Sequence, residues 1–195
     1  EMGALCEEVI KLASEALTER SAALAAKVAP LDSEIDQKER TIESMCLKLL
    51  LQQQPVAKDL RQISAALKMI TDMERIGDQI RDIAETAAER CTLPGADEIV
   101  TMCECCSVMI KGSLDAYIGR DVDGARRVEA KDDKVDAAFD SLKIQLSERI
   151  KTEENTDDIL NYLMIGKYLE RIGDHATNIA EWTNYVVKGT KDESQ

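Results

Sequence analysis

The sequence predicts an all-α protein built as two tandem three-helix bundles, with six long antiparallel helices related by a pseudo-twofold axis. Three observations lead to this class. Aromatic residues make up only 3 % of the 195 residues while 44 % are hydrophobic, so the core must be aliphatic, as is usual in helix bundles. Apolar side chains recur at helical spacing over long stretches. A twelve-residue pattern also occurs twice, which indicates an internal repeat.

The repeated pattern divides the chain into two halves. Residues 74–85 read Glu-Arg-Ile-Gly-Asp-Gln-Ile-Arg-Asp-Ile-Ala-Glu, and residues 170–181 read Glu-Arg-Ile-Gly-Asp-His-Ala-Thr-Asn-Ile-Ala-Glu, so eight of twelve positions match at an offset of 96. Upstream, residues 32–36 (Asp-Ser-Glu-Ile-Asp) resemble residues 132–136 (Asp-Asp-Lys-Val-Asp) at an offset of 100. Chance is a poor explanation for two matches in the same order.

Each half is expected to hold three helices. In the first half they span about 2–19, 21–53 and 58–90, and in the second half about 97–118, 121–152 and 156–188. Rods of about 30 residues joined by short turns must pack antiparallel. We therefore predict two domains, residues 1–94 and 95–195.

The expected helix ends follow from individual residues. Pro55 and the Pro94-Gly95 pair cannot continue a helix. Gly119 can close the fourth helix, and Asp121 or Asp123 can cap the fifth. Pro30 is expected either to kink the second helix or to delay its start.

The charge balance limits the classes of partner. A formal net charge of −13 argues against nucleic acid and against docking on an anionic membrane surface. It suits cation binding, or a protein partner with a basic face. No apolar run approaches the roughly 20 residues that span a bilayer, and no signal peptide is visible, so a cytoplasmic protein is expected.

The six cysteines do not predict a zinc site, because no His or second cysteine pair completes a four-ligand set. Cys103 and Cys106 continue a row with Ile99 and Ile110 at helical spacing. They are expected to be small buried hydrophobes.

Carboxylates recur every four residues on the predicted third helix of each half. Like charges at this spacing cost a few tenths of a kcal/mol per pair, so evenly repeated carboxylates suggest a compensating cation. An oxygen-only set favours a hard cation such as Mg²⁺, Mn²⁺, Ca²⁺ or ferric iron. The first acidic row is Glu74, Asp78 and Asp82, and the second acidic row is Glu170, Asp174 and Asn178.

A solvated stripe neutralised by Arg75 and Arg81 is the alternative interpretation of the first acidic row. The presence of Gly77 and Gly173 three residues after each Glu favours a functional row. A glycine inside a helix costs roughly 1 kcal/mol, so keeping one twice suggests close approach by another backbone, a ligand or a partner. Tight packing between helices is the simpler explanation, and it is compatible with access for a metal.

Two single residues carry separate expectations. Glu39 lies on a core line where the second half has Phe139, so it needs a partner or serves as an extra ligand of the first half. His175, the only histidine, follows Asp174 and points about 100° away from the row. We expect it to be a partly exposed surface residue.

The motifs resemble a known family. The sequence Gln-Gln-Pro-Val-Ala-Lys-Asp-Leu-Arg at 53–61, followed by Glu-Arg-Ile-Gly-Asp at 74–78 and again at 170–174, is similar to the PhoU family of phosphate-transport accessory proteins. The similarity runs from Met2 to about Val187.

The resemblance implies metal clusters held by Glu/Asp-x-x-x-Asp motifs on the faces of two helical bundles. It leaves the ion open among Mg, Mn, Fe, Zn and Ca. Asn178 brings one charge fewer than Asp82, so equal affinity of the two sites is not expected. Carried onto this chain, the metal candidates are Asp36, Glu74, Asp78 and Asp82 in the first half and Asp136, Glu170, Asp174 and Asn178 in the second.

The resemblance also implies a regulatory rather than catalytic role. PhoU proteins repress the phosphate-starvation response and restrain uptake by contacts with the phosphate ABC transporter ATPase and a membrane sensor histidine kinase. They commonly form homodimers and reach the membrane only through protein partners.

Two other functional classes remain to be compared with this one. A dinuclear metal enzyme of ferritin-like type needs Glu-x-x-His pairs, but His175 stands five residues after Glu170. A histidine phosphotransfer bundle needs His175 on an exposed helix face.

Overall fold

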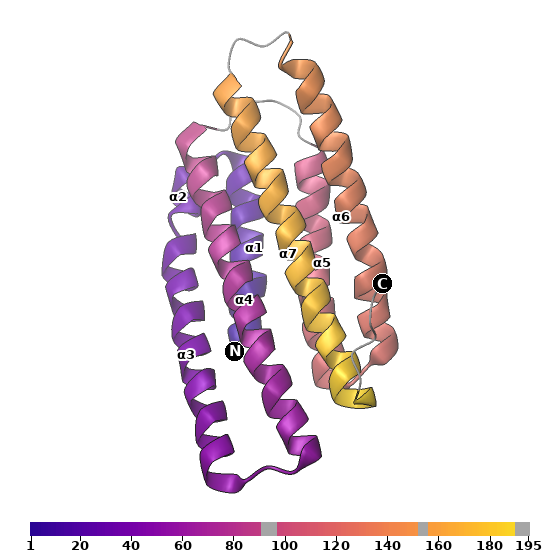
Figure 1. Cartoon of the computed structure of the whole chain (residues 1–195). Helices are drawn as coiled ribbons and strands as arrows, with labels where there is room; N and C mark the ends of the chain where they lie inside the picture. The colour runs from indigo at the N-terminus through magenta and orange to yellow at the C-terminus, as the bar shows by residue number, and fades with distance from the viewer. Residues whose placement is uncertain (91–96, 152–155, 190–195) are drawn as a thin grey trace.

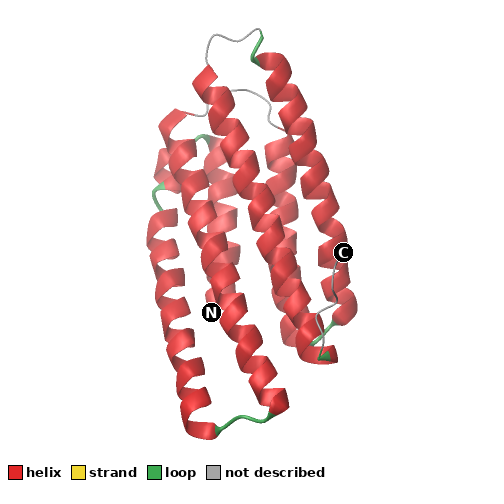
Figure 2. Cartoon of the chain, viewed as in Figure 1, coloured by secondary structure: helices red, strands yellow, loops and turns green. Residues whose placement is uncertain are grey.

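The computed structural model describes residues 1–90, 97–151 and 156–189, and these form helices joined by short turns (Figures 1 and 2). No strand occurs in these ranges, so the predicted all-α class with six long helices is confirmed. No helix in them is long and apolar enough to cross a bilayer. The helices are α1 (Met2–Glu19), α2 (Ala22–Ala25), α3 (Val28–Gln53), α4 (Ala57–Arg90), α5 (Asp97–Gly119), α6 (Val122–Arg149) and α7 (Thr156–Lys188).

The second predicted helix differs from its expected range of 21–53. The structure divides it into the single turn α2, whose first N–H groups are capped by the Ser21 hydroxyl at 3.3 Å from Leu24 N, and the long helix α3. Pro30 lies in the first turn of α3, where its missing N–H removes no helical hydrogen bond. The long helix therefore begins late, two residues before Pro30.

Non-glycine residues in the left-handed region end three of the helices: Arg20 after α1, Gln54 after α3 and Arg120 after α5. Gly119 was expected to close α5, but it is the last helical residue, and Arg120 makes the turn. Asp121 is the N-cap residue of α6, as expected. The sixth helix, α6, ends at Arg149 and is followed by a turn at residues 150–151, so it is about three residues shorter at this end than the predicted range of 121–152. The break at Pro94-Gly95 and the domain boundary at 94/95 lie outside the described residues, and the division into domains stays a prediction.

Helices α4 and α7 pack along each other and join the two halves (Figure 1). Helices α1 and α3 pack on α4, helices α5 and α6 pack on α7, and α1 also contacts α5. The two central helices supply large, fully buried side chains to a common core, including Ile76, Ile80 and Ile83 from α4 and Ile165, Leu169 and Ile172 from α7.

Equivalent cysteines show that the two halves repeat in detail. The Cys6 thiol donates to the Met73 carbonyl at 3.7 Å, and the Cys106 thiol donates to the Leu169 carbonyl at 3.2 Å. Both thiols are buried, as is Cys103, so the predicted role as small hydrophobes is confirmed for Cys103 and Cys106. Burial raises the pKa of Cys103 to about 12. Cys91 lies outside the described residues.

The two mid-helix glycines are explained by close packing between helices. A Cβ at Gly77 would lie 2.8 Å from Asp32 Oδ1 on α3, and a Cβ at Gly173 would lie 2.7 Å from Asp132 Oδ1 on α6. The predicted close approach is therefore made by an aspartate of the neighbouring helix in both halves. Ile35 tightens the first contact, because its Cδ1 atom would lie 3.1 Å from the added Cβ.

Substitution of Gly77 by Ala tests this packing. Although alanine is the better helix former, we expect Gly77→Ala to destabilise the protein by about 1–3 kcal/mol, because Asp32 is buried and cannot move away. Urea denaturation followed by circular dichroism measures the change. Gly119→Ala is the matched control, because its Cβ would meet no atom of a neighbouring element within 4 Å in the described part of the chain. Equal stability of the two variants would contradict this account.

Candidate functional site

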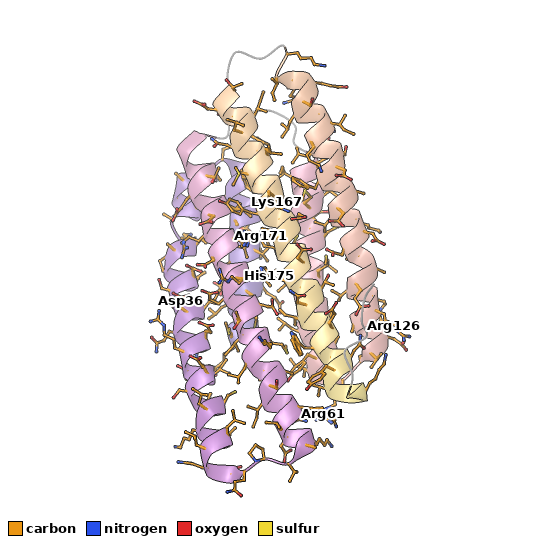
Figure 3. The ribbon with its side chains drawn as sticks, viewed as in Figure 1. Asp36, Arg61, Arg126, Lys167, Arg171 and His175 are labelled. Carbon is orange, nitrogen blue, oxygen red and sulfur yellow. The ribbon has the colours of Figure 1, made fainter. Side chains whose placement is uncertain are left out.

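The predicted acidic rows lie on the two central helices and face the neighbouring helix of their own half. Glu74 on α4 lies close to Asp78 of the same helix and to Asp36 on α3, which Figure 3 labels. Glu170 and Asp174 on α7 lie close to Asp136 on α6. The structure therefore brings together the Glu, the first Asp and the second-helix Asp of each predicted set.

Arg81 is the centre of the first acidic row. Its Nη1 atom lies 2.5 Å from Asp32 Oδ2, and its Nη2 atom lies 2.9 Å from Asp78 Oδ1. Asp82 and Glu85 each have a carboxylate oxygen 3.9 Å from the same guanidinium. Burial raises the pKa of Asp32, and Arg81 opposes this shift. Arg81 thus links α4 to the buried carboxylate of Asp32 on α3. It also offsets the negative charge of the nearby carboxylates on its own helix.

Glu39 belongs to the same group of carboxylates. It is half-buried on α3, where burial raises its pKa and the nearby Glu43 and Asp36 add to the shift. Burial likewise raises the pKa of Glu74, with contributions from Asp78 and Glu39. Arg75 offsets part of this charge, because its Nε atom lies 3.6 Å from Glu74 Oε2.

The second acidic row contains less positive charge. Thr177 stands where the first half has Arg81, and it offers only a neutral hydroxyl. Burial raises the pKa of Asp132 to about 6, and the charges of Asp136 and Asp174 add to the shift. Asp132 Oδ1 is buried, and the described residues give it no hydrogen-bond partner.

The other carboxylates of this row are also crowded. Burial of the carboxylate raises the pKa of Asp174, although the residue as a whole is exposed, and Glu170 and Asp136 add to the shift. The pKa of Asp136 is raised for the same reasons, by burial and then by Glu170. Lys167 contacts the row through an ion pair with Glu170.

The third member of each row turns toward the opposite half of the protein. Asn178 Nδ2 donates to Asp72 Oδ1 of α4 at 3.2 Å. At the equivalent place, the Tyr168 hydroxyl of α7 is hydrogen-bonded to Asp82 of α4. These two pairs follow the internal repeat, because Tyr168 corresponds to Asp72 and Asn178 to Asp82. Asn178 is thus held by a residue of the other half, whereas Asp82 contacts both Tyr168 and the Arg81 guanidinium of its own row. A metal role for either residue stays a prediction.

His175 was expected to be a partly exposed surface residue; it is intermediate in exposure, and it lies between α4 and α7 in contact with Asp72. Its Nδ1 atom lies 2.9 Å from Asp72 Oδ1, and its side chain is 17 % exposed (Figure 3). Spacing along one helix could not reveal this position, because the partner lies on a different helix 103 residues away. A histidine held in this way fits a structural contact better than the exposed phosphoryl acceptor of a phosphotransfer protein.

The acidic rows are open ridges and not closed metal cages. Within the ranges that the structure describes, no three Asp, Glu, His or Cys side chains are grouped so that they could enclose a metal ion. Their oxygen-only chemistry still fits a hard cation, which is often held by one or two carboxylates and several waters. Asp32 Oδ1 in the first row and Asp132 Oδ1 in the second both lack a hydrogen-bond partner among the described residues. Burial and then the charges of Asp136 and Asp174 raise the pKa of Asp132, while Lys167 opposes the raised pKa of Asp136 and of Asp174.

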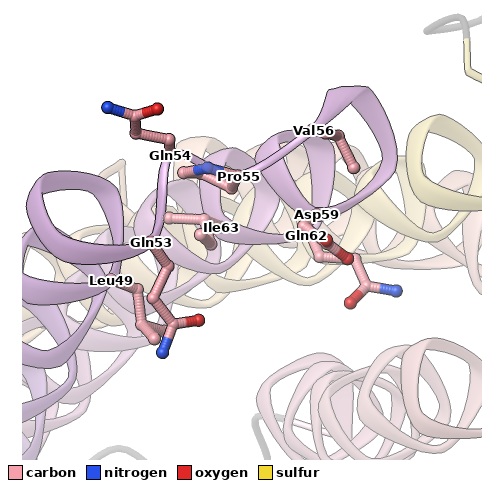
Figure 4. Close-up of a pocket in the computed structure, with 8 residues that line it drawn as sticks. All are labelled: Leu49, Gln53, Gln54, Pro55, Val56, Asp59, Gln62 and Ile63. Atoms are coloured by element: carbon pink, nitrogen blue, oxygen red, sulfur yellow. The ribbon is translucent and has the colours of Figure 1, made fainter.

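A separate cleft lies at the α3–α4 turn (Figure 4). It has a volume of about 350 Å³ and is lined by the Gln-Gln-Pro segment of the sequence motif, by Leu49, Val56, Gln62 and Ile63, and by one carboxylate, Asp59. Its lining is largely apolar and amide-bearing, so it is chemically unlike the acidic rows.

The raised pKa of Asp132 predicts a pH-dependent stability. Its folded-state pKa of about 6 lies above the ordinary value of 3.8, so the folded protein binds the proton more tightly than the unfolded chain does. Ionised Asp132 therefore destabilises the fold increasingly as the pH rises from about 4 to 6 and fully above it. We expect Asp132→Asn to be more stable than the parent by about 1 kcal/mol at pH 7.5, once solvent screening is allowed for, and equal to it near pH 4.

Urea denaturation with a chelator present, repeated across this pH range, measures the difference. Asp133→Asn, at the exposed neighbouring position, is the control for loss of one charge. If the difference in stability between Asp132→Asn and the parent stays constant with pH, the pKa of the Asp132 carboxyl is not raised in the folded protein.

Comparisons with known proteins cover nearly all of the chain. The family model described as the PhoU domain matches residues 1–87 and again residues 99–183. The phosphate-specific transport system accessory protein PhoU homolog of Synechocystis sp. is 37 % identical over 194 residues, which cover 98 % of this chain and 87 % of the relative. The homolog of Pseudomonas aeruginosa is 34 % identical over 97 % of this chain and 80 % of the relative.

Two solved structures share the fold. The crystal structure of PhoU from Pseudomonas aeruginosa matches with a TM-score of 0.93 at 34 % identity, covering 97 % of this chain and 93 % of that one. The phosphate transport system regulatory protein PhoU from Streptococcus pneumoniae matches with a TM-score of 0.92 at 25 % identity, covering 99 % and 93 % of the two chains.

Proposed function

This chain belongs to the PhoU family, and from that premise we propose that it is an accessory protein of phosphate-specific transport that regulates phosphate uptake. The match to accessory proteins of that transport system over nearly the whole chain, with the duplicated Glu-Arg-Ile-Gly-Asp motif in both halves, carries this proposal. The regulator restrains uptake and represses the phosphate-starvation response through protein contacts. It performs no catalysis of its own.

Its partners are the ATPase of the phosphate ABC transporter and a sensor histidine kinase. The charge of −13 and the two acidic rows on adjacent helices support this choice, because they favour partners with basic faces. The packed helices support it too, because they hold the rows in fixed positions and little conformational freedom is lost on docking. We propose that the protein acts in the cytoplasm, as a homodimer, and reaches the membrane through these partners.

Bound cations are the second part of the proposal. Asp36, Glu74 and Asp78 in one half and Asp136, Glu170 and Asp174 in the other are the carboxylates that would hold them. A cation bound there would neutralise the like charges of the carboxylates. It would also be a positive centre that could bind a carboxylate of a partner protein or a phosphate group. The crowding of Asp136 and Asp174 supports this role.

Neutralising both rows tests the proposal. A variant with Glu74→Gln, Asp78→Asn, Glu170→Gln and Asp174→Asn is expected to stay helical, because these side chains lie at the edges of the helix packing and not in the core. We expect it to lose its bound metal in elemental analysis. We also expect at least tenfold less transporter ATPase to be recovered with it from phosphate-replete cells, as measured by affinity capture and quantitative mass spectrometry.

A charge-matched control carries Glu8→Gln, Glu19→Gln, Glu104→Gln and Glu148→Gln, which are exposed and lie outside the acidic rows. It should behave as the parent does in both measurements. If the two variants capture the ATPase equally well, the acidic rows are not the docking surface. If the parent captures no transporter component, the regulatory proposal itself is wrong.

A further inference from the structure

The turn between α3 and α4 differs in charge from the rest of the protein. Residues 44–71, which we call the α3–α4 tip, include the Gln-Gln-Pro-Val-Ala-Lys-Asp-Leu-Arg motif and contain four basic residues but a single acidic one, Asp59. The tip therefore carries a net charge of +3, and because the whole chain carries −13, the other residues carry −16. A positive end on an acidic protein favours an acidic partner.

The internal repeat shows that this charge is particular to the first half. The corresponding segment of the second half, residues 144–167, holds five acidic and three basic residues and has a net charge of −2. Because α4 and α7 run in opposite directions, their first turns lie at opposite ends of the bundle (Figure 1). Both segments join a long helix to a central helix, so the topology does not require the difference in charge.

Large apolar side chains are exposed at the α3–α4 tip. Leu51 and Val56, on either side of the turn, are 85 % and 71 % exposed. Leu47 lies one turn before Leu51, and Leu60 lies one turn after Val56, so each pair shares one face of its helix. Scattered exposed apolar residues are normal, but a cluster of them indicates a surface that a partner covers. The exposed members of the cluster are Met45, Leu47, Leu49, Leu51, Val56 and Leu60.

The tip extends past the end of α7. The guanidinium of Arg61, in the second turn of α4, lies against Gly189, which follows the last residue of α7. The first turn of α4 and the α3–α4 turn therefore lie beyond α7, as Figure 1 shows. The cleft of Figure 4 opens here, and it contains both exposed Val56 and the partly exposed Leu49.

We propose that the α3–α4 tip is a docking surface for an acidic segment of a partner protein. The apolar side chains of that segment enter the cleft, and its carboxylates face the exposed Lys48 and Lys58. An apolar centre with a charged rim is the usual composition of such an interface.

This inference deepens the proposed function, on which it rests. The acidic rows suit a partner with a basic face, and the tip suits a partner of the opposite character. Of the two proposed partners, the ATPase is expected at the acidic rows, so the sensor histidine kinase is the partner for the tip. One molecule then holds both proteins at once through separate surfaces.

A second copy of the chain and a lipid surface match the tip less well. Two copies that met tip to tip would bring two like charges of +3 together, and a tip bound to the acidic surface of the next copy would form an open chain and not a closed dimer. An anionic lipid surface would attract the tip, but it would repel the −16 of the other residues and is too flat to fill the cleft.

A photoreactive residue in the cleft tests the proposal. Val56→p-benzoylphenylalanine should leave the fold intact, because Val56 is largely exposed, and cells that carry this variant are irradiated at high phosphate. We expect a crosslink to the sensor histidine kinase, in a segment where acidic residues outnumber basic ones, as identified by mass spectrometry. The same residue at Ile144, which is 63 % exposed on α6, is the control and should give no such crosslink.

Changes at the tip should weaken this contact. The pair Lys48→Gln and Lys58→Gln removes two exposed charges, and Leu51→Ser removes an exposed apolar side chain. Each variant is expected to lower the yield of the Val56 crosslink by about tenfold. The matched controls are Lys27→Gln with Lys111→Gln, and Leu160→Ser, which change exposed residues outside the tip and should leave the yield unchanged.

The acidic-row variant of the preceding section shows whether the two surfaces are independent. It should keep the Val56 crosslink to the kinase, although it loses the ATPase. Loss of both partners in that variant would show that the tip is not a separate docking surface.

The remaining outcomes separate this inference from the proposal on which it rests. If Val56 crosslinks to a second copy, to lipid, to the ATPase or to a segment without an excess of acidic residues, the inference is wrong. The same holds if no crosslink forms while the parent still captures the ATPase, and in all these cases the regulatory proposal stands. If the parent neither captures the ATPase nor gives a crosslink, both are wrong.

Discussion

The site depends on the close approach of a second helix to a glycine on each central helix. At Gly77 and Gly173 the absence of a side chain lets α3 and α6 place an aspartate oxygen directly against the neighbouring helix. This packing withdraws Asp32 and Asp132 from water, and a withdrawn carboxylate must find a positive partner, keep its proton or weaken the fold. The first half meets this demand with Arg81, and the second half leaves it partly unmet.

Much of this architecture could be predicted from the sequence because it is encoded locally. Helical periodicity and helix-breaking residues place the long helices within a few residues, and the duplicated motif reveals the pseudo-twofold relation. The paired glycines correctly indicated a close approach, and Cys103 and Cys106 lie in the core because they continue an apolar row. The start of α3 was harder to predict, since Pro30 was compatible with either a kink or a late start.

The unpredicted features all require knowledge of which residues on different helices face one another. The contacts of His175 and Asn178 with Asp72, and the contact of Asp82 with Tyr168, depend on the register of α4 against α7. Arg81 was recognisable as a neighbour of Asp78 along its own helix, but its stronger partner is Asp32, 49 residues earlier in the chain. The spacing of residues along one helix contains no information about contacts between different helices. When these contacts are unknown, the two acidic rows look more alike than they are.

The ion pairs of Arg81 affect how a partner can be oriented on the protein. A body with two equivalent faces offers an approaching molecule two interchangeable ways to dock. Here the guanidinium neutralises Asp32 and Asp78 between α3 and α4, whereas the equivalent position of the second half holds the neutral Thr177. A basic protein partner can therefore distinguish the two halves, although they are duplicates of one another. A single residue position gives the partner a preferred orientation.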